Sequence, residues 1–206
     1  MATLGVLVLL TACGPASRPF GVIESGYQVK PSSMAVLAGD TGEADMRLAE
    51  FLTAELQEQT RCNVLSQAQI RKRVPKYPMT IETETPENPK KPVWIAPKEN
   101  GKLDALRKKL QVDYLFVVWT FNLQRTIVHS YGGGSSTNYS VTVLGNLIDY
   151  PSRSVVSFTE MYPSTGKGLL TLFKKDSYFV EKMLKGSAAS IASSLARTNP
   201  VLTAQK

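Results

Sequence analysis

The fold is decided by the stretch Val112-Asp113-Tyr114-Leu115-Phe116-Val117-Val118-Trp119-Thr120-Phe121-Asn122-Leu123. It is the part of this 206-residue chain richest in β-branched and aromatic residues, which favour strands. The pattern predicts a meander of strands over residues 112–123 (extended past a bulge by 126–131), 139–148 and 154–161. The glycine-rich turn 132–136 and the tight turn 149–153 join them, so these strands must be antiparallel.

Upstream of this meander, strand and helix patterns alternate. They predict a buried strand over 34–38, an amphipathic helix over 43–60, a strand over 62–65 and a short helix over 67–74. Glu43 and Asp45 suit the first turn of the longer helix, and Ser66 can cap the shorter one.

Residues 75–100 hold six of the twelve prolines, which excludes a helix or a central strand there. We expect a long excursion with Trp94 and Ile95 as its only large apolar anchors. A basic helix follows over 103–110, and a final helix covers residues 176–197.

The predicted class is therefore α/β (α+β), a mixed sheet with helices packed on it, in the order β-α-β-α-(Pro-rich insert)-α-β-β-β-α. The early β-α-β can be parallel, whereas the meander is antiparallel. A hydrophobic content of 43% and a charged content of 20% are typical of a globular domain, which we place at residues 34–200 with its insert at 75–100.

Several of these segments resemble a group of envelope lipoproteins, the curli-secretion lipoprotein CsgG and the LpoB-type activators of penicillin-binding proteins. The likeness is carried by Met34-Ala35-Val36-Leu37-Ala38 with the helix after it, by Asn63-Val64-Leu65-Ser66, by the strand 112–118, and by the hairpin 147–156. Trp119 and the turn 151–153 depart from the pattern. The resemblance implies a shared α/β domain and a role in the bacterial envelope.

The N-terminus supports the same location. An apolar run over residues 4–10 leads to Leu10-Thr11-Ala12-Cys13, which resembles a bacterial lipobox. That resemblance implies a signal peptide over 1–12, Cys13 carrying lipid (palmitate among it), and a tether over 13–33. No Lys or Arg precedes the apolar run, so we expect the natural start to lie upstream. By resemblance to lipoprotein sorting signals, Gly14 in place of Asp after the cysteine implies the outer membrane, with the domain facing the periplasm.

Basic residues gather at 71–76, at 90–91 and at 107–109, and the net charge is +7. Nucleic acid does not suit the predicted location. Anionic lipid headgroups or acidic envelope polymers suit it better, and a solvated face without a ligand stays open. With Cys13 lipidated, Cys62 has no cysteine partner, and we expect it to be buried in the core.

Chemistry-bearing motifs are few. Asp40-Thr41-Gly42 matches the aspartic-protease triplet, but Gly39 precedes it and the chain has no second copy. His129 is the single histidine, which excludes a His/Cys zinc site within one subunit. We expect no catalytic residue, metal or cofactor. A strand-to-helix turn accounts for Asp40 better than a protease site does.

Three aromatic residues are candidate partner-binding positions: Trp94 in the insert, and Tyr131 and Tyr139 at the glycine-rich hairpin. We therefore expect a non-enzymatic accessory or assembly factor that binds an envelope protein, such as a cell-wall synthase or a secretion component. The alternative is a subunit of an oligomeric outer-membrane secretion channel like the curli protein, and a homo-oligomer stays open. A remoter alternative is an aspartic-type hydrolase that uses Asp40.

Overall fold

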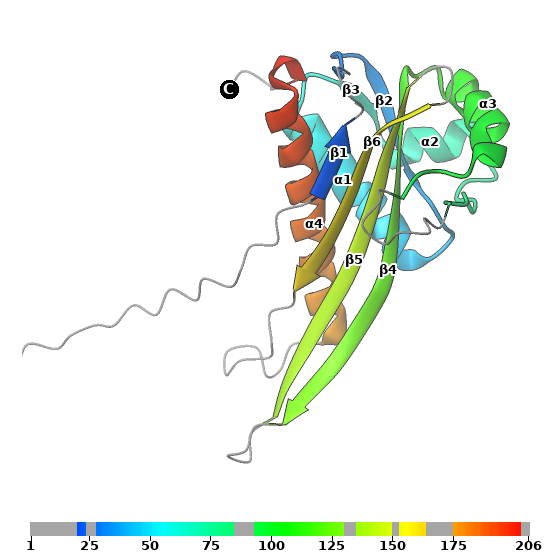
Figure 1. The fold of residues 1–206 in the computed structure, drawn as a ribbon. Coiled ribbons are helices and arrows are strands. Elements are labelled where there is room, and N and C mark those ends of the chain that lie inside the picture. The colour runs from blue at the N-terminus through cyan, green and yellow to red at the C-terminus, as the bar shows by residue number, and fades with distance from the viewer. Residues whose placement is uncertain are drawn as a thin grey trace, which may run out of the picture.

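Six strands form one mixed sheet in the order β1-β6-β5-β4-β2-β3 (Figure 1). The computed structural model describes residues 20–23, 28–84, 93–129, 135–149, 153–163 and 175–202. Its strands are β1 (Phe20–Ile23), β2 (Ser33–Ala38), β3 (Asn63–Leu65), β4 (Tyr114–His129), β5 (Ser135–Asp149) and β6 (Arg153–Pro163). Its helices are α1 (Glu43–Gln59), α2 (Gln67–Arg73), α3 (Asn100–Leu110) and α4 (Asp176–Thr198), with 3₁₀ turns η1 (Pro97–Glu99) and η3 (Pro200–Leu202).

The topology confirms the predicted fold class. β2 runs parallel to both β3 and β4, whereas β4, β5 and β6 form the antiparallel meander. The bulge lies between Phe121 and Gln124, where the register with β5 shifts and Asn122 adopts a φ of 50°. β4 nevertheless continues through it as one strand.

Helices α1 and α4 pack together on one face of the sheet (Figure 1). Their buried apolar residues include Leu48, Leu52, Phe179, Met183 and Ile191. A polar contact also ties α1 to the sheet, because the backbone N–H of Thr120 in β4 donates to Asp45 Oδ1 at 2.8 Å. This face holds the main helical layer of the core.

The insert lies along the opposite face. The indole Nε1 of Trp119 donates to the carbonyl of Ile81 at 3.0 Å. Asn146 in β5 donates from Nδ2 to the carbonyl of Val93 at 3.0 Å and accepts the N–H of Ile95 at 3.2 Å. Side chains of β4 and β5 therefore hold both described parts of the insert.

The described parts of the insert, 75–84 and 93–100, are more ordered than their prolines indicate. Thr83 and Ile95 form an antiparallel bridge, and the N–H of Glu84 donates to the carbonyl of Trp94 at 2.8 Å. The expectation that Trp94 and Ile95 are its only large apolar anchors is wrong, because Tyr77 and Ile81 are also buried.

Tyr77 completes an edge of the sheet that β3 leaves open, since β3 pairs with β2 only as far as Ala35. Beyond that point the N–H of Ala38 donates to the Tyr77 hydroxyl at 2.9 Å, and Gln67 Nε2 donates to the carbonyl of Val36 at 2.9 Å. The two side chains also join each other at 3.0 Å. The side chains of Tyr77 and Gln67 thus bind the backbone groups of β2 that β3 does not reach.

The segment that precedes β2 also contributes to the domain. β1 lies within the predicted tether and pairs antiparallel with β6. Val29 is buried, and its N–H donates to Asn199 Oδ1 after α4 at 3.0 Å. The folded part therefore begins before residue 34, because pairing with a distant strand orders a stretch that has little pattern of its own.

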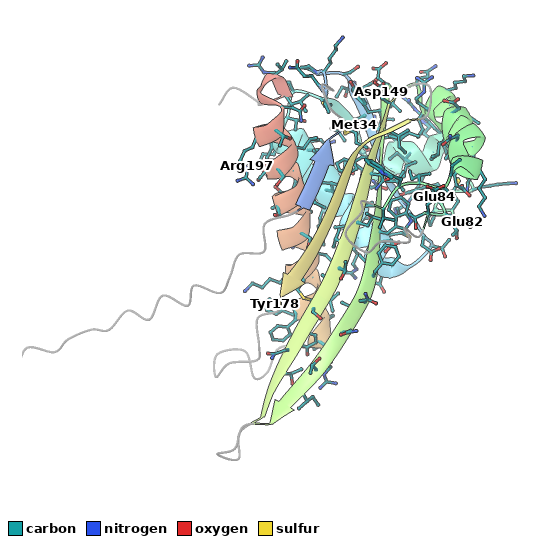
Figure 2. The ribbon with its side chains drawn as sticks, viewed as in Figure 1. Met34, Glu82, Glu84, Asp149, Tyr178 and Arg197 are labelled. Atoms are coloured by element: carbon teal, nitrogen blue, oxygen red, sulfur yellow. The ribbon has the colours of Figure 1, made fainter. Side chains whose placement is uncertain are left out.

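The outer half of the β4–β5 hairpin extends beyond the helices (Figure 1). Three of its large apolar side chains are exposed, Phe121 at 40%, Leu123 at 47% and Ile127 at 50%. Tyr178 marks the end of α4 that reaches toward it (Figure 2). Within the described segments, no helix has both the length and the apolar character needed to cross a bilayer.

Candidate binding groove

A groove lies between α3 and the chain that follows α2. Its volume is about 410 Å³, within the range of ligand pockets in proteins. It is lined by Val74, Pro75, Lys76, Met79, Lys102, Ala105, Leu106 and Lys109. The uncharged lining residues are therefore all aliphatic or thioether side chains, and the charged ones are all lysines.

Helix α3 forms one side of the groove, because the helical repeat places several of its lining residues on one face. Leu103, Leu106 and Leu110 are buried against the body of the protein. Lys102, Ala105, Leu106 and Lys109 follow i, i+3, i+4 and i+7 spacing, which places them along one adjoining stripe of the helix. One apolar stretch therefore lies between two lysines about 10 Å apart along the helix axis, given a rise of about 1.5 Å per residue.

The lysines differ in how they are held. Lys102 Nζ lies 3.1 Å from Glu99 Oε2 and also donates to the carbonyl of Thr80, so it is fixed at the rim. Within the described part of the chain, Lys76 and Lys109 form no ion pair, and both are exposed. Glu82, which lies on the insert near α3 (Figure 2), pairs with Lys98 at 2.6 Å.

The fold brings two of the three basic clusters together. Residues 71–73 form the last turn of α2, and residues 107–109 form the last turn of α3. Both helix ends favour positive charge because of the helix dipole. Arg73 donates to the carbonyl of Leu110 and so joins the two helices, while Arg71 pairs with Glu50 at 3.0 Å. The third cluster, 90–91, lies outside the described residues.

Asp40 and Asp45 make up the other group with potential chemistry. Asp40 Oδ1 accepts the N–H of Thr41 and the hydroxyl of Thr80, each at 2.8 Å, and these bonds lower its pKa. Asp45 is buried, and the desolvation raises its pKa, with a further contribution from the charge of Asp40. The pKa values of these two neighbouring carboxyls thus shift in opposite directions. Asp45 already has a structural contact, because it accepts a hydrogen bond from Thr120 and so links α1 to β4.

Replacing Asp45 by Asn should raise the melting temperature at neutral pH. The amide keeps an oxygen for the Thr120 donors and removes a buried charge. Because the folded pKa of Asp45 is raised, its contribution to stability is fully present below the ordinary value of 3.8 and is lost as the pH rises through the folded pKa. The increase in melting temperature in Asp45→Asn should therefore disappear as the pH falls toward 3.8. Thermal unfolding of both proteins over a range of pH would measure this.

Asp113 is the matched control, because its pKa is shifted in the opposite direction to that of Asp45. It accepts hydrogen bonds from Ser32 and from Ser33, whose hydroxyl lies at 2.6 Å, and these lower its pKa. Its contribution is present above the ordinary pKa and is lost on acidification. Asp113→Asn should lower the melting temperature at neutral pH and converge with the wild type in acid. Equal pH profiles for both variants would contradict these assignments.

The structure separates the aromatic residues proposed from the sequence. Trp94 is half-buried in the insert. Tyr139 is only 3% exposed, stacks on Phe179 at 5.0 Å between ring centroids, and donates to Asp176 Oδ1 at 2.6 Å. Tyr139, proposed from the sequence as a partner-binding residue, therefore packs against α4. Cys13 and Tyr131 lie outside the described residues.

The remaining candidates add no chemical site to the described segments. Cys62 is free and buried, as the sequence predicts. His129 ends β4, and only its backbone is described. Over the described segments, no three His, Cys, Asp or Glu residues gather as metal ligands.

Comparisons with known proteins identify solved structures of low identity. A PelC dodecamer from Paraburkholderia phytofirmans is 13% identical, with a TM-score of 0.46 over 91% of this chain and 99% of that chain. Lipoprotein GNA1162 from Neisseria meningitidis is 12% identical, with a TM-score of 0.47 over 79% of this chain and 99% of that chain. A minor lipoprotein from Acinetobacter baumannii is 11% identical, with a TM-score of 0.34 over 87% of this chain and 100% of that chain. The chain matches no protein-family model, and no curated protein matches it in sequence.

Proposed function

We propose that this chain is a lipid-anchored envelope lipoprotein that acts as a non-enzymatic accessory or assembly factor by binding another protein. The observation that carries the proposal is the lysine-rimmed apolar groove between α3 and the chain after α2. Concave apolar surfaces with a few placed polar groups are the usual form of binding sites. The partner class is an envelope protein, for which a cell-wall synthase and a secretion component are the candidates.

The proposed anchor and the groove are compatible. Lipidation at Cys13 and sorting to the outer membrane by Gly14 are inferred from the lipobox-like sequence. β1, the first described strand after that site, forms one edge of the sheet, whereas α2 bonds to β2 near the other edge (Figure 1). A lipid attached upstream of β1 would leave the groove accessible.

Crosslinking of the intact lipoprotein in native membranes tests this function. We expect a distinct envelope protein among the products by mass spectrometry, and we expect its yield to fall in a Cys13→Ser variant that cannot be anchored. A ladder of self-crosslinks in place of a second protein would contradict the accessory role and support an oligomer.

The second candidate is a subunit of an oligomeric outer-membrane secretion channel, as the resemblance to the curli protein suggests. The favouring observation is the projecting β4–β5 hairpin, whose pairing with β2 ends at Val118 and which exposes Leu123 and Ile127. If this surface joins subunits, Leu123→Glu with Ile127→Glu should abolish the self-crosslink ladder. A monomer in mild detergent would argue against the channel.

The remoter hydrolase alternative rests on Asp40 and its neighbour Asp45, whose pKa values shift in opposite directions as in some acid–base pairs. Asp40 is exposed, so Asp40→Ala should leave the fold intact. An unchanged cellular phenotype in that variant would remove this alternative.

A further inference from the structure

From the groove we infer the chemistry of its occupant: an acidic segment of a protein partner, in which an apolar side chain is flanked by carboxylates. This inference rests on the proposed function as a protein-binding factor and adds the kind of sequence that is bound.

The floor of the groove selects an apolar group. Val74, Pro75, Met79, Ala105 and Leu106 line it without a hydrogen-bonding side chain among them. A polar group inserted there would lose its hydration without gaining a side-chain partner, which is unfavourable. Met79 is half-buried and flexible, so it can adapt to an entering aliphatic or aromatic side chain.

The rim favours negative charge at Lys76 and Lys109, which line the groove from the segment after α2 and from α3. Lys102 is held in place by Glu99 and Thr80, and Lys109 lies two turns further along the same stripe of α3. Lys76 faces them from the segment after α2. Since no acidic side chain in the described residues is paired with Lys76 or Lys109, a ligand that brings carboxylates would complete these charges.

Concavity favours a peptide over a lipid surface. An anionic bilayer presents charged headgroups in a broad layer, and it would attract all exposed lysines of α2 and α3 alike, including Lys72 and Lys108. It would leave an apolar hollow between the lysines unfilled. A segment with an apolar residue between acidic ones matches both features of the groove at once.

A peptide-display selection on the full chain tests the inference. We expect the wild type to enrich peptides with an aliphatic or aromatic residue between Asp or Glu residues. The enriched peptide, labelled with fluorescein, should bind about tenfold or more weakly to Lys76→Glu/Lys109→Glu by fluorescence polarisation. Ala105→Trp, which fills the groove from an exposed helix position, should abolish its binding.

Lys72→Glu/Lys108→Glu is the matched control, because it changes the net charge equally at positions that do not line the groove. It should retain most of the affinity, and thermal unfolding should confirm that every variant is folded. Enrichment of peptides without this composition, enrichment of none, or equal loss in both double variants would overturn the inference. So would binding to phosphatidylglycerol vesicles that needs the lysines but persists in Ala105→Trp, since that indicates a membrane contact.

The same variants distinguish this inference from the proposed function. If the intact lipoprotein still crosslinks to a distinct envelope protein when the groove is filled by Ala105→Trp, the accessory role stands and the groove assignment fails. If no distinct protein crosslinks to the wild type, the accessory role fails, whatever the peptide selection returns.

Discussion

Replacing Gly39 by Ala is expected to destabilise the domain by about 3 kcal/mol or more, because the new methyl group has no room. A Cβ built at Gly39 would lie 2.0 Å from Trp119 Nε1 and 2.2 Å from its Cε2. The indole cannot move away without losing its hydrogen bond to Ile81 at 3.0 Å. The glycine backbone is also held, since its N–H donates to Val118 at 2.7 Å and its carbonyl accepts from Ile81 at 2.8 Å.

Urea unfolding followed by circular dichroism would measure this effect. Gly42→Ala is the matched control, because nothing lies within 4 Å of a Cβ at Gly42. Gly42 is the N-cap of α1, so this change should cost at most about 1 kcal/mol. Adding Trp119→Leu to Gly39→Ala should recover part of the loss by removing the indole. A Gly39→Ala variant as stable as the Gly42→Ala variant would show that the close approach does not contribute as argued.

The close approach also explains a detail of the sequence. Gly39 precedes the Asp-Thr-Gly triplet, whereas apolar residues normally precede this triplet in aspartic proteases. The structure supplies a packing reason for this glycine, since it lies beneath Trp119 where β2 ends. Local sequence could show that the motif was atypical, but it could not show the indole that demands glycine, because Trp119 lies on another strand.

Elements with strong local patterns could be predicted closely. The meander follows from dense β-branched and aromatic residues, and α1 begins at Glu43 as predicted because apolar spacing and first-turn acids agree. Residues 20–23 carry no comparable pattern and become a strand only by pairing with β6. Tyr77 and Ile81 were missed for a similar reason, since distant backbone and side-chain groups hold them among the prolines.

The binding groove could be predicted only in pieces. The basic clusters were visible in the sequence, but their assembly depends on the packing of α2 against α3, which no local pattern specifies. The spacing of Lys102, Ala105, Leu106 and Lys109 on one helix was the available indication. Tyr139 shows the converse error, because an aromatic residue near a glycine-rich turn suggested exposure, while α4, from much later in the chain, covers it.

Asn146 should be the side chain that most strongly holds the second part of the insert. It is fully buried in β5, and its amide satisfies the carbonyl of Val93 and the N–H of Ile95. Asn146→Leu has a similar size but leaves both backbone groups without this partner, each at a cost of about 1–3 kcal/mol. We therefore expect a loss of about 3 kcal/mol in urea unfolding and faster cleavage of the insert by protease. Asn138→Leu, at an exposed position of the same strand, is the matched control and should change neither.

Asn146→Asp separates the hydrogen bonds from the packing. An ionised carboxylate can still accept from Ile95, but its second oxygen would face the carbonyl oxygen of Val93, so this variant should be strongly destabilised at neutral pH. Acid should restore part of the stability, because a protonated carboxyl can donate to that carbonyl.

The groove lies on the other part of the insert, where Met79 is flanked by Tyr77 and Ile81, both anchored independently of Asn146. Peptide binding should therefore survive in Asn146→Leu below its unfolding transition, and a simultaneous loss of binding would show that the two parts of the insert act as one unit.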